Sequence, residues 1–256
     1  MIVGLDRFRE FFRDYQNHYA LIGGVATLQW LEEAGFNPRA TKDFDLVLLI
    51  ENLDDGYLRR FWDFVRAGKY STLQKSTGER IYYRFANPEE TDYPFMMEIF
   101  SRAKDGMTLW SDQRIVPIHA DADASSLSAI LMDEDYYALV RDHTEVRDGL
   151  PLLSAESLIL LKAKAWLDLH ARKLRAGSVD ERHIKKHRND LFKLSMLLAP
   201  GDTMGIPRSV LDDLMDFLQR FPADSPEWGS IRQATGIGDQ MPAPDELVGI
   251  IARHYV

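Results

Sequence analysis

The spacing of apolar residues predicts alternating helices and strands in the first half of the chain. Helical spacing occupies residues 5–15 and 55–67, and another helix begins at Gly24 and ends near Gly35. Short apolar runs at residues 19–22, 44–50, 81–86, 95–101 and 114–118 predict strands, and the run at 44–50 is apolar enough to be covered on both faces. The stretch 87–92, which contains Pro88, predicts a turn or hairpin loop.

From Ser154 onward the pattern becomes almost entirely helical. Ser154 is a predicted N-cap for a long helix that ends near residues 176–177, and further helices are predicted at 184–198, 207–221 and 244–255. This change of pattern predicts two domains, residues 1–153 and 154–256. The expected fold class is α+β, with a mixed β-sheet flanked by helices and then an all-helical C-terminal lobe.

Composition limits the chemistry available to the chain. Its 256 residues are 45% hydrophobic, which is enough to bury a full core. Cysteine is absent, which excludes disulfides, thiolate metal sites and a cysteine nucleophile. Any metal must then be held by oxygen or imidazole ligands, and a hard cation such as Mg²⁺ is the natural candidate.

Neither a signal peptide nor a membrane span is expected. The first ten residues mix charged with apolar side chains, so we expect a cytoplasmic protein. The most apolar stretch, residues 152–169, is interrupted by four charges, which favours a water-exposed helix over a membrane span.

Positive charge is concentrated in one segment of an acidic chain. The net charge of −9 argues against general nucleic-acid binding. Residues 172–193, called the basic segment below, nevertheless carry eight cationic side chains: Arg172, Lys173, Arg175, Arg182, Lys185, Lys186, Arg188 and Lys193. A solvated helical face is the commoner explanation for such a run, and contact with an RNA backbone is the functional alternative.

Two carboxylates stand at the start of the most apolar predicted strand. On a strand Asp43 and Asp45 project to the same face, about 6.6 Å apart along the chain, while Phe44 points to the other face. Because like charges repel, this placement favours a cation between them. By itself the pattern is common, and a solvated strand end is the alternative.

Glu98 is a third candidate ligand. It is the charged residue inside the apolar run 95–101, and burying a lone carboxylate is costly. If this strand lies beside the strand at 44–50, Glu98 can join Asp43 and Asp45 around one or two divalent ions. The alternative is a salt bridge with Arg84 or Arg102.

Gly23 and Gly24 end a predicted strand and begin a helix. Backbone N–H groups at a helix start, together with the positive end of the helix dipole, suit an anionic phosphate. Most Gly-Gly pairs are tight turns without a ligand. Here the pair lies upstream of the strand that starts with Asp43 and Asp45, so a phosphate site and the carboxylates could face one another.

This combination resembles the nucleotidyltransferase superfamily of the polymerase-beta type. The signature is Gly-Gly or Gly-Ser, a helix, Asp-x-Asp or Asp-x-Glu, and a later acid on another strand, which Gly23, Gly24, Asp43, Asp45 and Glu98 match. Gly24 stands where the superfamily often has Ser. The resemblance implies a nucleotidyltransferase-type sheet, with Mg²⁺ (or Mn²⁺) on the three carboxylates and a nucleoside triphosphate (NTP) as co-substrate.

Residues 22–26 and 39–46 look like the AbiEii-type branch, the toxin components of abortive-infection toxin-antitoxin systems. That branch has a Leu-rich helix bearing a lysine and a later basic segment ending in Asp-Leu, which residues 160–165 and 185–191 resemble. The resemblance implies that Lys162 and the group Lys186, His187 and Arg188 meet the triphosphate, with Asp190 orienting Lys162 and Thr27 assisting phosphate contact. A purely structural salt bridge between Lys162 and Asp190 is the alternative.

Together these expectations describe transfer of a nucleoside monophosphate from an NTP to an acceptor hydroxyl, with Asp43, Asp45, Glu98, Lys162 and Asp190 as catalytic residues. The acceptor implied by the toxin resemblance is an RNA, for instance a tRNA end, and a cognate antitoxin is an implied partner. Alternatives are a small-molecule transferase of the antibiotic-modifying type and a non-catalytic nucleotide-binding or partner-binding module.

Overall fold

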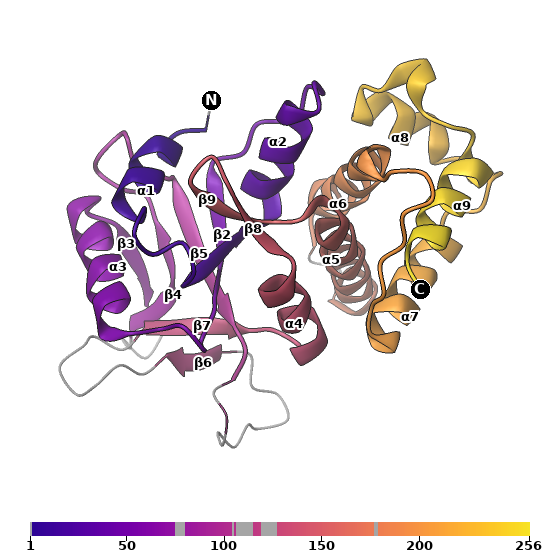
Figure 1. Ribbon diagram of the computed structural model, residues 1–256. Coiled ribbons are helices and arrows are strands. Elements are labelled where there is room, and N and C mark those ends of the chain that lie inside the picture. The colour runs from indigo at the N-terminus through magenta and orange to yellow at the C-terminus, as the bar shows by residue number, and fades with distance from the viewer. Residues whose placement is uncertain (1, 75–79, 104, 106–114, 119–126, 177–178) are drawn as a thin grey trace. The chain divides into compact units, whose positions relative to one another are not determined.

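The computed structural model describes residues 2–74, 80–103, 105, 115–118, 127–176 and 179–256 (Figure 1). Its contacts divide the chain into two compact units. The first comprises Met1–Ala26 and Arg39–Leu153, and the second comprises Thr27–Pro38 and Ser154–Val256. The predicted division into domains at 153/154 stays a prediction.

The first unit is built on a mixed β-sheet. Its described strands are β1 (Tyr19–Ile22), β2 (Asp43–Leu48), β3 (Ser71–Gln74), β4 (Arg80–Ala86), β5 (Met96–Ser101), β6 (Ile115–Ile118), β7 (Leu127–Leu131), β8 (Thr144–Arg147) and β9 (Leu150–Leu153). Seven of them follow the order β3-β4-β5-β2-β1-β9-β8, while β7 pairs with β5 and β6 with β7. The pairs β2–β5, β1–β9 and β5–β7 are parallel and the others antiparallel. The expected mixed sheet is confirmed.

Helices α1 (Leu5–Phe11), α3 (Asp55–Ala67) and α4 (Glu134–Asp142) also belong to this unit. An aromatic core joins the first two to the sheet: the Phe8 ring lies 5.3 Å from that of Phe44 and 5.5 Å from that of Phe64. Phe44 is fully buried, as the apolar face of a strand requires. The face of β2 that carries Phe44 is therefore the core face, and Asp43 and Asp45 belong to the other.

A tight hairpin joins β8 to β9. Asp148 and Gly149 both have positive φ, 45° and 74°. Two such central residues define a type I′ turn, whose twist matches that of the flanking strands. This hairpin carries β9 onto β1, with Leu152 opposite Leu21, and so extends the sheet beyond β1.

The described secondary structure of the second unit is helical apart from an isolated β-bridge between Met204 and Tyr255. It contains α5 (Ala155–Ala176), α6 (Glu181–Leu194), α7 (Arg208–Gln219), α8 (Trp228–Thr235), α9 (Pro244–His254) and two short 3₁₀ turns, Ser195–Leu197 and Gly238–Gln240. Its core includes an aromatic cluster in which the Phe192 ring lies 4.9 Å from Trp228 and 5.8 Å from Phe217. The expected all-helical C-terminal region is confirmed.

Helix α2 (Gly23–Glu33) runs across the division, since Thr27–Pro38 belongs to the second unit. Predicted elements differ from the observed ones mainly at their ends. The helix at 5–15 ends at Phe11, and the strand at 44–50 ends at Leu48, where Asn52 N–H closes a turn on Leu49 O. The helix at 184–198 starts earlier, at Glu181, because Asp180 caps it.

No helix among the described residues is long and apolar enough to span a bilayer.

Candidate active site

Four adjacent strands place the predicted carboxylates in one row. Ile22 at the end of β1 pairs with Asp45 on β2, Asp45 pairs with Glu98 on β5, and Glu98 pairs with Arg84 on β4. Directly paired residues share a face of the sheet, and Asp43 lies two positions from Asp45 on that same face. The hypothesis that the strand of Glu98 lies beside that of the two aspartates is therefore confirmed.

The Gly-Gly turn lies directly against the Asp45 carboxylate. Gly23 has φ +63°, in the left-handed region that glycine tolerates, and a Cβ placed on it would lie 1.9 Å from Asp45 Oδ2. No side chain fits in that gap. Glycine at position 23 thus lets the carboxylate reach the strand-to-helix turn.

Gly24 is needed for a different reason. A Cβ on Gly24 would lie 2.6 Å from Thr41 Oγ1, so the Thr41 hydroxyl lies over the first turn of α2. Thr41 stands two residues before Asp43, and the sequence pattern assigned it no role. The turn at Gly23 and Gly24 is covered by Thr41 on one side and Asp45 on the other.

Asp43 supplies the observation that favours a cation. Its Oδ1 atom is buried and has no hydrogen-bond partner among the described residues. A buried carboxylate oxygen without a donor is costly, and a second carboxylate two residues away adds repulsion. A hard divalent cation held by Asp43 and Asp45 would remove both costs, so this pair fits Mg²⁺ or Mn²⁺.

Glu98 forms an ion pair with Arg84, its neighbour in the row. Arg84 Nε donates to Glu98 Oε1 at 2.6 Å, and Arg84 Nη2 pairs with the same oxygen. In the described part of the chain, no three acidic or histidine side chains are grouped so that they could hold a metal as they stand. Of the two salt bridges considered for Glu98, the one with Arg84 forms. Glu98 as a third metal ligand stays a prediction that requires this pair to open.

The close contact at Gly24 gives a test of this geometry. Gly24→Ala should destabilise the protein by about 1–3 kcal/mol, because the new methyl group overlaps the Thr41 hydroxyl. Gly24→Ala with Thr41→Ala should recover most of that loss, since alanine is otherwise the better helix former by about 1 kcal/mol. Urea unfolding of the wild type, Gly24→Ala, Thr41→Ala and the double variant measures both effects. Equal stability of Gly24→Ala and the wild type would contradict the close approach.

The second unit holds the other predicted residues. Lys162 Nζ on α5 donates to Asp190 Oδ2 on α6 at 2.9 Å, and their side chains are only 3% and 8% exposed. Lys193 Nζ, on the next turn of α6, donates to Asn37 O at 2.6 Å. Burial lowers the pKa of Lys193, while the charge of Asp190 raises it. The salt bridge between Lys162 and Asp190 is therefore present, and contact of Lys162 with a triphosphate stays a prediction.

Arg188 does not present its charge to solvent. Its side chain is 2% exposed, and its Nη1 atom pairs with Glu227, the residue that precedes α8. Burial lowers the pKa of the guanidinium although Glu227 opposes the shift. Lys186 and His187 are half-buried, and Thr27 is buried at 4% exposure. Phosphate contacts by these four residues stay predictions.

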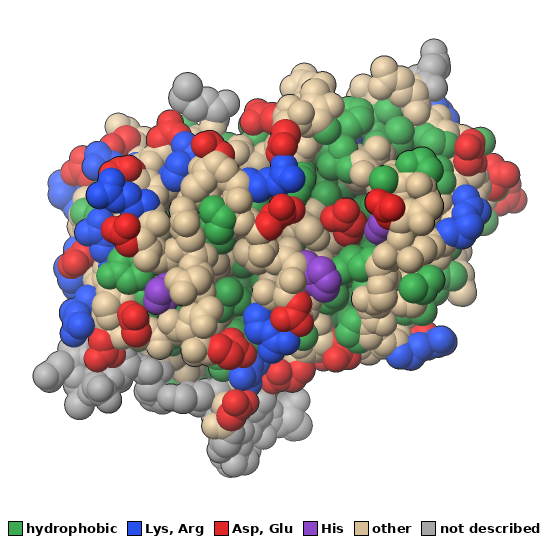
Figure 2. All heavy atoms as spheres, in the orientation of Figure 1, with side chains coloured by type: hydrophobic (Ala, Val, Ile, Leu, Met, Phe, Trp, Pro, Cys, Tyr) green, Lys and Arg blue, Asp and Glu red, His purple; other side chains and the backbone are tan. Residues whose placement is uncertain are grey.

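The basic segment presents less positive charge to solvent than its eight cationic side chains suggest. Lys193 and Arg188 are buried, and Lys173 and Lys185 both pair with Glu181. Arg182 pairs with Asp180. On the face shown in Figure 2, basic and acidic side chains are interspersed. The predicted RNA contact would therefore rest on fewer cations than the eight counted from sequence.

Comparisons with known proteins add little. No family model matches the chain, and no curated protein matches it. One solved structure, JHP933 from Helicobacter pylori, aligns with 97% of this chain and 87% of its own at 14% identity and a TM-score of 0.39. A second, a proposed nucleotidyltransferase from H. pylori, aligns with 97% and 88% at 14% identity and a TM-score of 0.35. Likeness at this level says nothing about which reaction this chain performs.

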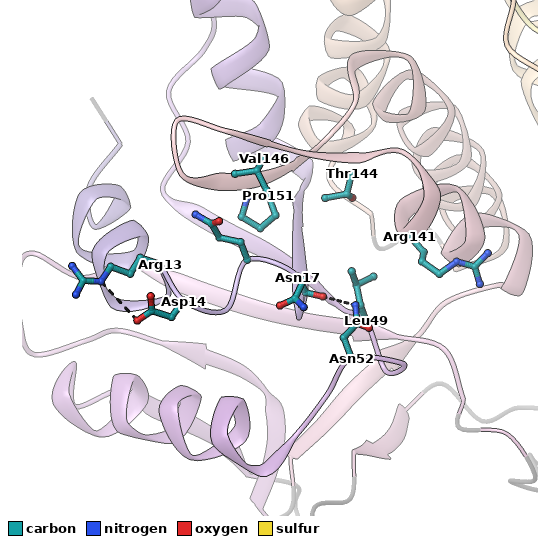
Figure 3. A pocket seen from close by; sticks show the side chains of 10 residues that line it. Arg13, Asp14, Asn17, Leu49, Asn52, Arg141, Thr144, Val146 and Pro151 are labelled. Carbon is teal, nitrogen blue, oxygen red and sulfur yellow. Dashed lines mark hydrogen bonds and ion pairs between the residues drawn. The ribbon is translucent and has the colours of Figure 1, made fainter.

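A separate hollow of about 460 Å³ lies in the first unit (Figure 3). The hollow is lined by Asn17, which precedes β1, and Leu49, which follows β2, among others. Gly23 instead follows the other end of β1, where Ile22 pairs with Asp45. The two arginines of the hollow already have acidic neighbours: Arg13 lies near Asp14 and Arg141 pairs with Asp142. This hollow is thus distinct from the row of carboxylates.

Proposed function

We propose that the chain is a metal-dependent nucleotidyltransferase that moves a nucleoside monophosphate from an NTP to an acceptor hydroxyl. The observation that carries the proposal is the contact of the Asp45 carboxylate with Gly23, next to Asp43, whose buried Oδ1 atom has no hydrogen-bond partner in the described part of the chain. A strand-to-helix turn suits phosphates, and two carboxylates beside it suit the cation that accompanies them. Either feature alone is common, and their contact makes the combination specific.

Asp43 and Asp45 would hold Mg²⁺ or Mn²⁺, and the bound cation would neutralise phosphate charge and polarise the reacting oxygens. The turn at Gly23 and Gly24 positions the phosphates. The acceptor oxygen attacks the α-phosphorus in line, a new P–O bond forms, and the bond to the β-phosphate oxygen breaks so that pyrophosphate leaves. Glu98 takes the proton of the acceptor hydroxyl once it is released from Arg84.

The finer assignments are also proposals. An RNA acceptor and an antitoxin partner follow from the AbiEii-type resemblance of residues 39–46, and a small-molecule acceptor is the alternative. The rival of a different class is a non-catalytic nucleotide-binding or partner-binding module, which would bind an NTP without turning it over. The two enzymes differ in which acceptor they modify, and the non-catalytic module differs from both in having no turnover. One experiment therefore separates the three candidates.

The experiment incubates the protein with each of the four NTPs, labelled at the α-phosphate or at the γ-phosphate, together with Mg²⁺. Total RNA, the protein itself and an aminoglycoside serve as separate acceptors. Transfer is expected to place the α-label on one acceptor and the γ-label in pyrophosphate, with chelation by EDTA abolishing both. Binding of NTP without any release of pyrophosphate, under every acceptor, would favour the non-catalytic module and overturn the enzyme proposal.

A further inference from the structure

Arg84 completes the row of polar side chains, and the proposed reaction gives it no direct role. It lies on β4, opposite Glu98, and its side chain is 40% exposed while that of Glu98 is 16% exposed. A guanidinium carries five N–H donors in a planar fork. The Glu98 contact uses donors on Nε and Nη2. A partly exposed arginine thus lies beside the candidate catalytic carboxylates.

The strand β4 is irregular next to Arg84. Phe85 pairs with Thr72 of β3, but the next β3 residue, Leu73, pairs with Ile81. Three residues of β4, positions 82–84, therefore bulge out of the ladder with β3. Bulges bend a strand and re-aim its side chains, and they are frequent beside functional sites. Along its other edge β4 pairs with β5, and there Arg84 stays directly opposite Glu98.

The order of strands separates Arg84 from the phosphate turn. The row runs from β1, which ends at Gly23, through Asp45 and Glu98 to Arg84. With about 4.8 Å between neighbouring strands, Arg84 lies about 14 Å from the β1 end of the row. The NTP phosphates belong at Gly23 and Gly24, so the Glu98 and Arg84 end is left for the acceptor.

We propose that Arg84 binds a phosphate group of the acceptor, so that the acceptor of this transferase is a phosphate-bearing molecule of the nucleotide or polynucleotide class. This inference rests on the proposed function. Arginine forks match phosphate oxygens in pairs, and an exposed guanidinium repels a cationic acceptor such as an aminoglycoside. When a phosphate takes the fork, the Glu98 carboxylate is released to accept the hydroxyl proton of the same acceptor. Acceptor binding and proton transfer are thereby coupled through one ion pair.

The test compares two acceptors that differ only in backbone charge: a ten-nucleotide RNA and its uncharged methylphosphonate analogue, each with a free 3′-hydroxyl. The wild type should use the RNA far better. Arg84→Gln should raise the KM for the RNA about tenfold to hundredfold, as loss of a charged hydrogen bond predicts, and leave the KM for the NTP unchanged. For the methylphosphonate acceptor, wild type and variant should be equal. Arg66→Gln, which removes another exposed arginine of the first unit that pairs with an aspartate, is the matched control.

Direct binding gives a readout that does not depend on turnover. Arg84→Gln should weaken RNA binding and reduce the salt dependence of log Kd by about one phosphate contact, a slope change of about 0.7 for a single strand. Glu98→Gln should instead tighten RNA binding, because Arg84 loses its competing partner. If Arg84 only held Glu98 in place, both variants would leave RNA affinity unchanged, and that result would overturn the inference.

The outcomes also separate this inference from the proposed function. Wild-type transfer to an aminoglycoside or to the methylphosphonate as efficiently as to RNA would leave the enzyme intact and refute the phosphate-bearing acceptor. Absence of transfer to every acceptor, with RNA binding still opposite in sign for the two variants, would refute the enzyme and support the Arg84 contact.

Discussion

Replacing both Asp43 and Asp45 by asparagine should lower the rate of nucleotidyl transfer by a factor of about 10³ or more, the scale expected when charge stabilisation of a phosphoryl transition state is lost. The amides have about the same volume as the carboxylates, but they lack the negative charge that binds a hard cation. The measurement is kcat with the labelled NTP at saturating Mg²⁺. Each single variant should lie between the double variant and the wild type.

The same double variant should not be less stable than the wild type in the absence of metal. Two like charges on one face of β2 repel each other, and the buried Asp43 Oδ1 atom receives no hydrogen bond from any residue that the structure describes. Replacing both carboxylates by amides removes the repulsion between the charges and the cost of the buried charged oxygen. Addition of Mg²⁺ should then raise the Tm of the wild type by linkage and leave the double variant unchanged.

A matched control removes two charges elsewhere. Asp212 and Asp216 lie on α7, each in a surface ion pair, with side chains 58% and 50% exposed. Asp212→Asn with Asp216→Asn should keep both the activity and the Mg²⁺-dependent rise in Tm. Mg²⁺-dependent transfer by the Asp43 and Asp45 double variant at the wild-type rate would refute the metal role of the pair.

The arrangement of Asp43, Asp45 and the Gly23-Gly24 turn could be predicted because it depends on residues that are close together in the sequence. Alternation along β2 places Asp43 and Asp45 on one face whatever the rest of the fold does. The turn at Gly23 and Gly24 follows the neighbouring β1, and the short strand, helix, strand unit from Tyr19 to Leu48 can be arranged in few ways. The contact between Gly23 and Asp45 then follows from the pairing of Ile22 with Asp45.

The partner of Glu98 could not be predicted because it depends on strand order. Arg84 and Arg102 were equal candidates by sequence. Arg84 lies on β4, which pairs with β5, whereas Arg102 follows the end of β5 and bonds to Glu51 and Asp105. A sequence does not state which strands are neighbours, and a shift of one residue in register would have turned Arg84 to the opposite face.

Other elements were missed although a signal existed. Asp148-Gly149 between two short apolar runs is a strong hairpin signal, and it predicts β8 and β9. Leu152 and Leu153 of β9 fall instead in the apolar stretch 152–169 that was interpreted as helical. Burial of Arg188 had no such local signal, because its partner Glu227 lies 39 positions away.

Breaking the Lys162 and Asp190 pair should be the most destabilising change in the second unit. Removing one member of a buried ion pair typically costs about 3–5 kcal/mol, because the remaining charge stays buried without compensation. Lys162→Met should fall in this range, measured by urea unfolding. Surface pairs such as Arg208 with Asp212 should contribute less than about 1 kcal/mol by the same measurement.

The two members of the pair should not be equivalent. Loss of Lys162 leaves Asp190 with the nearby charge of Lys193, whereas loss of Asp190 leaves both Lys162 and Lys193 buried without the carboxylate that favours their charged forms. Asp190→Leu should therefore destabilise the protein more than Lys162→Met does. It should also lower the pKa of Lys193 further, since the charge of Asp190 is what raises it. Equal losses for the two variants would contradict this asymmetry.

The double variant separates structure from function. Lys162→Met with Asp190→Leu replaces a buried pair by apolar side chains of similar size, which in other proteins is often neutral for stability. If the pair serves only to join α5 and α6, the double variant should fold and keep its transfer rate. If Lys162 meets the triphosphate, as the family resemblance implies, the folded double variant should show a raised KM for the NTP with an unchanged KM for the acceptor. A raised KM for the acceptor alone would contradict the triphosphate role, since Lys162 would then act on the other substrate.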